Sequence, residues 1–219
     1  MRCASTSRTA TRWRRKPSAT RLSISRFSSR PYWSIITFSL VLAACTGGGP
    51  KFKSTDITGV DYGKSLELAD TRGRVRHLED FRGKAVVVFF GFTHCPDVCP
   101  TTLADLARVM QDLGPDADRA QVLFITVDPE RDTPADLDKY VHAFDPRFIA
   151  LRGDAQQTAR VAKEFKIYYE KRKQGSSYTV DHSAQSYVID PQGRLRLLVR
   201  HDRLAQDLPD DLRVILKQG

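Results

Sequence analysis

Two cysteines separated by three residues are the chemically most informative feature of this sequence. Cys95 and Cys99 lie in the segment 91–100 (GFTHCPDVCP), directly after an apolar run and directly before a predicted helix. Thiolates are nucleophiles and also soft metal ligands, which select Cu(I), zinc or iron–sulfur clusters. Because a helix N-terminus favours negative charge, we expect the pKa of both thiols to be lowered. The spacing suits an ion held between the sulfurs at least as well as a tight disulfide.

A nitrogen ligand would complete such a site, because Cu(II) and Zn(II) prefer nitrogen in addition to sulfur. Three of the five histidines lie in segments where we expect surface positions: His77, His142 and His201. His94 adjoins Cys95, but neighbouring side chains at a bend usually diverge. His182 precedes a predicted strand, in a loop that a mixed sheet can bring beside the cysteines. The residues alone favour His182 over His94 without deciding between them.

The elements that must position these residues follow from hydrophobic periodicity. Continuous apolar runs predict buried strands over residues 85–90 and 121–127. Further strands are expected over 148–151, 167–170, 186–189 and 195–199, with a hairpin over 66–78. Helical spacing predicts helices over 103–113, 134–144, 154–165 and 209–216. Asp132 is expected to cap the second of these helices.

The order of these elements indicates an α/β fold. Strands and helices alternate in the first half, and an antiparallel hairpin, turned at 190–193, ends the second half. This order predicts a mixed central sheet with helices on both faces.

The charge of the chain is concentrated at its beginning. The formal net charge is +9, and nine of the 35 Lys and Arg residues lie in residues 1–45, which contain no acidic residue. The remaining 26 basic residues balance the 26 Asp and Glu residues. A neutral body has no global field that attracts phosphates, so we do not expect a nucleic-acid partner.

The basic leader has the features of an export signal. An apolar run from Tyr32 to Ala44 ends in small residues before Cys45, as in a bacterial lipoprotein signal. We expect 1–45 to be a lipoprotein-type signal and anchor with Cys45 acylated, and 46–58 to be a flexible tether. The folded domain, 59–219, would then face the periplasm or the cell exterior from the cell membrane. An ordinary signal peptide or an uncleaved anchor are the alternatives.

Three segments together resemble the Sco/SenC family. They are the cysteine segment 91–100, the segment 127–134 (VDPERDTP) and Asp181-His182-Ser183-Ala184 before the strand at 187–190. The resemblance covers residues 59 to 217. It implies a thioredoxin-like fold and one copper ion per chain, as Cu(I) or Cu(II), bound by Cys95, Cys99 and His182. It also implies an outer-shell role for Asp128, which orients the site or tunes its charge.

The resemblance implies a copper metallochaperone that delivers copper to the dinuclear copper centre of cytochrome c oxidase subunit II or to another acceptor. The same residues also fit a thiol-disulfide reductase, with Cys95 and Cys99 as the catalytic dithiol that keeps the acceptor's cysteines reduced. A peroxidase fits poorly, because two cysteines and a histidine are not a peroxidatic motif. A structural zinc site lacks an obvious fourth ligand.

Overall fold

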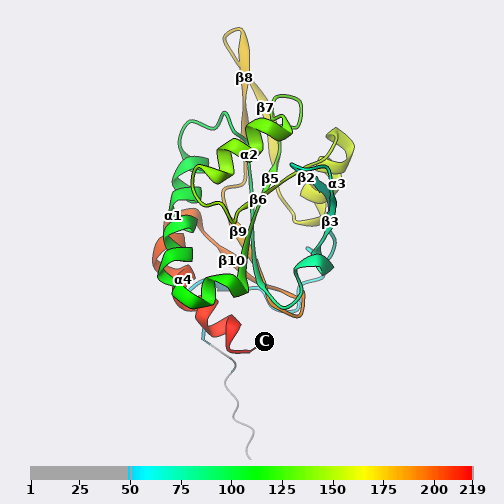
Figure 1. Ribbon diagram of the computed structural model, residues 1–219. Helices are drawn as coiled ribbons and strands as arrows, with labels where there is room; N and C mark the ends of the chain where they lie inside the picture. Colours follow the sequence, from blue (N-terminus) through cyan, green and yellow to red (C-terminus); the bar gives the residue numbers. More distant parts are fainter. Residues whose placement is uncertain (1–48, 50, 219) are drawn as a thin grey trace, which may run out of the picture. The chain divides into compact units, whose positions relative to one another are not determined.

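An eight-stranded mixed sheet forms the centre of the domain (Figure 1). The computed structural model describes residue 49 and residues 51–218. The strand order is β1-β10-β9-β4-β5-β6-β2-β3. Only the pairs β4–β5 and β5–β6 are parallel, and all others are antiparallel. The expected mixed sheet is therefore confirmed.

The two apolar runs form the middle of this sheet. Strands β4 (Ala85–Gly91) and β5 (Ala120–Thr126) lie side by side, and every residue in both is buried. Strand β6 (Ile149–Arg152) continues the sheet on one side, and β9 (Ser186–Ile189) and β10 (Leu195–Val199) on the other. These strands agree with the predicted ones, because a strand covered on both faces needs apolar side chains at consecutive positions.

Helices cover both faces of the sheet. Four α-helices are described: α1 (Val98–Asp112), α2 (Pro134–His142), α3 (Ala155–Glu164) and α4 (Leu204–Leu216). Phe89 lies next to Phe124, whose ring packs on Tyr140 of α2, whereas Phe90 packs on Phe165 at the end of α3. Because successive residues of a strand point to opposite faces, α2 and α3 cover different faces. None of the described helices is long and apolar enough to cross a membrane.

The sheet is completed by short strands from the start of the domain. Strands β2 (Glu67–Asp70) and β3 (Val75–His77) form the predicted hairpin at one edge. Strand β1 (Thr55–Asp56) pairs with β10 at the other edge, and the backbone amides of Lys53 and Ser54 donate to Asp211. The ordered fold therefore begins before residue 59, the expected boundary, and residues 53–58 are not free tether. Three short 3₁₀ helices lie at Leu78–Phe81, Gly114–Arg119 and His201–Arg203.

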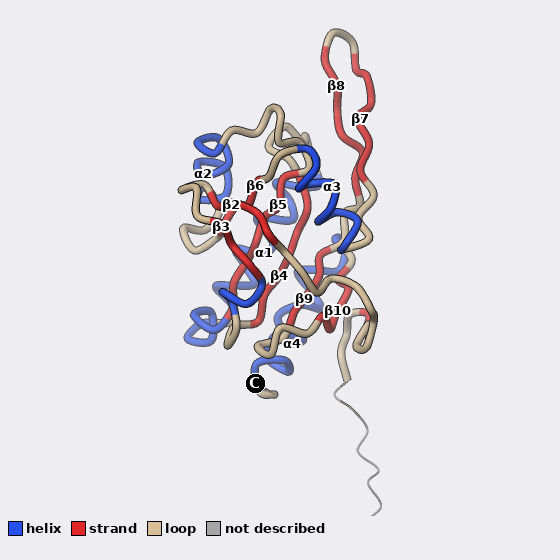
Figure 2. The backbone as a smooth tube through the Cα atoms, turned by 90° about the vertical axis from the view of Figure 1, so that its right-hand side faces the viewer, coloured by secondary structure: helices blue, strands red, loops and turns tan. Residues whose placement is uncertain are grey.

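A two-stranded hairpin stands apart from the central sheet. Strands β7 (Tyr169–Gln174) and β8 (Ser177–His182) pair only with each other and project beyond the rest of the domain (Figure 2). The strand predicted over 167–170 overlaps only the start of β7, and no strand was predicted at β8. Most side chains of the hairpin are exposed, so neither strand has the apolar pattern by which a buried strand is recognised.

Candidate metal centre

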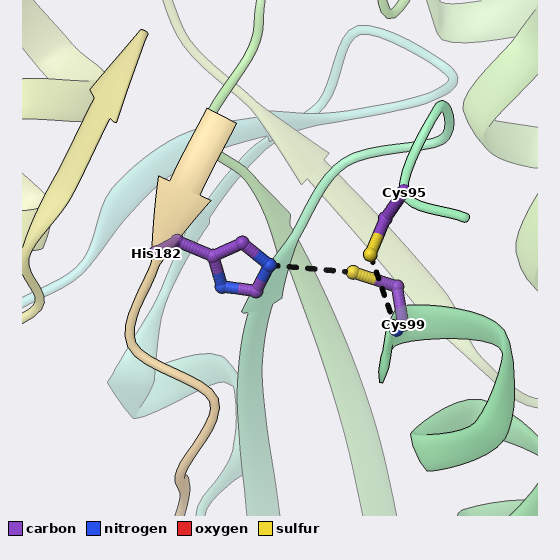
Figure 3. A group of neighbouring side chains, drawn as sticks. All are labelled: Cys95, Cys99 and His182. Carbon is purple, nitrogen blue, oxygen red and sulfur yellow. Dashed lines mark hydrogen bonds between the residues drawn. The ribbon is translucent and has the colours of Figure 1, made fainter. Parts of the chain in front are cut away.

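Cys95, Cys99 and His182 meet at one end of the central sheet (Figure 3). Their ligand atoms all lie within 4.8 Å of one another. Cys95 is in the loop after β4, Cys99 is in the first turn of α1, and His182 ends β8. Cys99 is buried, whereas Cys95 and His182 are partly exposed. In the part of the chain that the structure describes, no other group of histidine, cysteine and carboxylate side chains gathers in this way.

The hydrogen bonds of His182 direct one ring nitrogen at the sulfurs. Its Nδ1 lies 2.9 Å from the carbonyl oxygen of Ser183, which only accepts hydrogen bonds, so Nδ1 carries the proton. The lone pair is therefore on Nε2, which lies 3.5 Å from Sγ of Cys99. The edge of the ring packs against Phe92, with the ring centroids 5.7 Å apart. His182 is thus held in the tautomer that a metal ligand needs.

The two thiols differ sharply in acidity. A hydrogen bond from the Cys99 thiol lowers the pKa of Cys95 to about 3, with the backbone amides of Asp97 and Cys99 acting in the same direction. The Cys99 amide lies 3.4 Å from Sγ of Cys95. The same shared proton, together with burial, raises the pKa of Cys99 well above its usual range. Lowered pKa values were expected for both thiols. The expectation is wrong for Cys99, because the two thiols share one proton and Cys99, the buried partner, keeps it.

The His94 imidazole contacts Thr93 and Asp132 and is not grouped with the sulfurs. Its Nδ1 lies 3.0 Å from Oγ1 of Thr93 and 3.7 Å from a carboxylate oxygen of Asp132. His94, the alternative ligand that the sequence left open, is therefore not part of the cluster of Cys95, Cys99 and His182.

Asp132 fastens the cysteine loop instead of capping α2. Its buried carboxylate accepts from the Thr93 amide at 3.1 Å, from the Thr93 hydroxyl at 2.6 Å and from the Thr126 hydroxyl at 2.6 Å. The N-cap of α2 is Thr133, whose hydroxyl accepts from the amide of Asp136. The predicted N-cap of α2 was therefore wrong by one residue. The Asp132 carboxylate does not cap the helix because it accepts hydrogen bonds from hydroxyl and amide donors on two other segments.

Asp128 is fully buried but contacts none of the three candidate ligands in the hydrogen bonds of the described residues. Its carboxylate is paired with Arg131 and accepts from the Tyr178 hydroxyl at 2.9 Å. Neither Arg131 nor Tyr178 was among the predicted site residues. Arg131 could have been noticed within the segment 127–134, but Tyr178 carries no signal, since it lies in the unpredicted strand β8.

The site is open on one side. A hollow of about 310 Å³ lies between the cysteine loop and β8, and Cys95 and His182 both line it. Gly91 leaves room for Cys99, since a Cβ at position 91 would come 2.8 Å from Sγ of Cys99. A bound ion would therefore be buried on the Cys99 side and reachable from the Cys95 side.

Two sulfurs and one imidazole form a donor set suited to a soft or borderline metal ion. The fold and this donor set define a thioredoxin-like α/β protein with a Cys-Cys-His metal centre. Residues 54–217 match the SCO1/SenC family, and the chain belongs to that family.

The chain is similar in sequence to an animal relative, and in sequence and fold to a bacterial and a yeast relative. The chain is 43% identical over 152 residues to the mitochondrial SCO2 homologue of Bos taurus, covering 68% of this chain and 57% of that protein. ScoI of Bradyrhizobium japonicum, solved with copper bound, is 37% identical with a TM-score of 0.64, covering 72% of this chain and 98% of that one. Yeast Sco1 with copper bound is 30% identical with a TM-score of 0.65, covering 72% and 90%.

Proposed function

We propose that this protein is a copper metallochaperone that binds one copper ion through Cys95, Cys99 and His182. The observation that carries the proposal is the convergence of these three ligand atoms within 4.8 Å at an open end of the fold. Relatives with 37% and 30% identity have been solved with copper bound. Two sulfurs satisfy Cu(I), and the imidazole provides the nitrogen that Cu(II) prefers. Either oxidation state therefore fits the donor set.

The intended recipient is the dinuclear copper centre of cytochrome c oxidase subunit II or another copper acceptor. A related Sco protein is described as a member of a family of cytochrome c oxidase assembly proteins. Transfer by ligand exchange requires one ligand that an acceptor can reach. Cys95 is half-exposed and lines the hollow, whereas Cys99 is buried. We therefore expect an acceptor thiolate to displace Cys95 first and Cys99 last.

A thiol-disulfide reductase is the second candidate, and the acidity of Cys95 favours it. The low pKa of Cys95 keeps it as a thiolate, which is the nucleophilic form. The Cys95 thiolate would attack a disulfide of the acceptor and form a mixed disulfide. Cys99, after losing its proton, would attack Cys95 and release the acceptor's second thiolate. The acceptor's cysteines end reduced, and Cys95 and Cys99 end as a disulfide.

Complementation of an oxidase-assembly defect distinguishes the two functions. The variants are Cys95→Ser, Cys99→Ser and His182→Ala, with His94→Ala as the matched control. A chaperone requires both cysteines and His182, whereas a reductase retains function without His182. Full activity of all three variants would contradict both functions.

We also propose that the domain is tethered to the cell membrane by a lipid on Cys45 and faces the periplasm or the cell exterior. Cys45 lies outside the described residues, so only the sequence supports this tether. Mass spectrometry of the membrane-extracted protein tests it. A chain that begins at Cys45 with an acyl modification is expected, and a Cys45→Ser variant should be released from the membrane.

A further inference from the structure

The strand that carries His182 forms no hydrogen-bonded pairing with the central sheet among the described strands. Strands β7 and β8 pair only with each other among the described strands. The two cysteines, in contrast, follow directly from β4 in the middle of the sheet. His182 itself is linked to the sheet through residues 183–185, which lead into β9, so the orientation of the rest of β8 depends on the side chains that hold the hairpin against the body of the domain.

Arg131 connects the hairpin to the body at several points, beside an ion pair between Lys171 of β7 and Glu130. Its Nε is paired with the buried carboxylate of Asp128, and its Nη1 donates to the carbonyl oxygen of Tyr178 at 2.8 Å. Its guanidinium carbon lies 3.8 Å from the centroid of the Tyr178 ring. The Tyr178 hydroxyl closes the ring of contacts by donating to Asp128 at 2.9 Å. Arg131 thus binds the backbone carbonyl and the aromatic ring of Tyr178 directly, and it holds the Tyr178 hydroxyl through Asp128.

Strand β8 connects these contacts at Tyr178 to the position of His182. Side chains two residues apart in a strand lie on the same face, so Tyr178, Val180 and His182 share one face of β8. Val180 is buried on that face. Phe92 provides a second path, because its ring lies 5.9 Å from the Arg131 guanidinium and 5.7 Å from the His182 ring. A displacement at Arg131 would therefore move the imidazole.

The cysteine loop is held by different contacts from the same short segment. Asp132 fastens Thr93, two residues before Cys95, as described above. The segment 128–132 therefore holds the cysteine half of the site through Asp132 and the histidine half through Arg131 and Asp128. Because different side chains make the two sets of contacts, the halves can be perturbed separately.

We propose that Arg131 is a positioning residue of the metal centre, which places His182 opposite the sulfurs by fixing strand β8 to the segment 128–132. The guanidinium suits this role because its planar, multiple donors bind a carboxylate and a carbonyl at once while its face stacks on an aromatic ring. Since this role rests on the copper-binding function proposed above, its test includes a measurement that needs no copper.

The test compares Arg131→Lys with Arg152→Lys. Lysine at 131 keeps a positive charge beside the buried Asp128 but loses the planar donors and the stacked face. Arg152 is a matched control, because it donates to the Pro129 carbonyl at 2.8 Å in the same segment and makes no hydrogen bond to the hairpin. We expect Arg131→Lys to weaken Cu(II) binding by about tenfold, as is typical when an outer-shell partner is lost, and to leave Cu(I) binding nearly unchanged. Arg152→Lys should leave both unchanged.

Hydrogen exchange of the metal-free protein gives the second measurement. In Arg131→Lys the amides of β8 should exchange faster while those of β4 and β5 keep their protection, because only the attachment of the hairpin is weakened. A milder variant, Tyr178→Phe, removes only the hydroxyl bond to Asp128 and should show the same pattern to a smaller degree. This variant keeps the test valid if lysine at 131 impairs folding.

Unchanged Cu(II) affinity together with unchanged exchange in β8 would overturn the proposal. Equal losses of Cu(I) and Cu(II) affinity with faster exchange throughout the domain would also overturn it, because they indicate a general structural role. If His182→Ala leaves copper binding unaltered, the proposed function fails. The attachment of β8 by Arg131 is then still decided by the exchange measurement.

Discussion

The Sγ atom of Cys99 and the Nε2 atom of His182 lie 3.5 Å apart, although 83 residues separate them in the chain. The two atoms come from different parts of the fold, one from the start of α1 and the other from the end of a projecting hairpin. Because the two ligand atoms lie this close together, copper binding would need little rearrangement of these side chains, which lowers the free-energy cost of binding.

Replacing His182 should separate the two oxidation states of copper. In His182→Ala we expect Cu(II) affinity to fall by at least about 100-fold, the upper range for loss of an outer-shell partner, because a direct ligand is lost. Cu(I) affinity should fall much less, since both sulfurs remain. Competition titrations with chelators measure both affinities. His94→Ala is the control, and a loss of Cu(II) affinity equal to that of His182→Ala would contradict the ligand assignment.

The two thiols should react at very different rates. Because the pKa of Cys95 is lowered to about 3, its thiolate persists throughout the range of pH above that value. Alkylation of Cys95 should therefore be nearly independent of pH from about pH 5 to about pH 8, where an ordinary thiol with a pKa near 8.5 gains reactivity steeply. Cys99 should remain largely unmodified, because it is buried and its pKa is raised.

Mass spectrometry of the alkylated peptides measures this difference. In Cys99→Ala the pKa of Cys95 should rise, because the hydrogen bond from Cys99 is the largest cause of the lowered value and alanine has no donor. An unchanged pH profile in this variant would show that the pairing of the sulfurs is not the cause.

Adding one methyl group at Gly91 should disturb the sulfurs and not the imidazole. In Gly91→Ala the new Cβ meets Sγ of Cys99 at 2.8 Å and a ring carbon of Phe124 at 2.8 Å. Such overpacking typically costs about 1–3 kcal/mol of unfolding free energy. Because Cys99 must move, we expect Cu(I) and Cu(II) affinities to fall together, in contrast to His182→Ala. Gly49→Ala, with no heavy atom within 4 Å, is the control for denaturant titration.

Loss of the Asp132 carboxylate should loosen the cysteine loop. In Asp132→Ala the buried hydroxyls of Thr93 and Thr126 and the Thr93 amide lose their acceptor, which should lower the unfolding free energy by about 2–4 kcal/mol. Calorimetry should show a melting temperature lower by roughly 2–4 °C for each kcal/mol. Asp136→Ala, at an exposed cap, should cost less than Asp132→Ala. Equal melting temperatures for these two variants would rule out the fastening role of Asp132.

Much of the fold was predictable because buried segments have a recognisable local pattern of apolar residues. The apolar runs of β4 and β5 and the periodic stripes of the helices predicted the central layers, since each position's exposure follows from its element. The hairpin β7–β8 has no such apolar pattern. Its charged, exposed strands are held by particular contacts, such as those of Arg131 with Tyr178 and Asp128. Such contacts cannot be predicted from hydrophobic periodicity.

The chemistry of the site could be identified from local patterns: two thiols at a strand-to-helix junction, a histidine before a later strand, and the motifs of one family. The folded domain was needed to show which histidine faces the sulfurs, which thiol keeps the proton and what holds the imidazole in place. Residue types and spacing determine which chemistry is available. Distances between segments far apart in the chain, and the acidity that follows from them, are set by packing, which no local pattern contains.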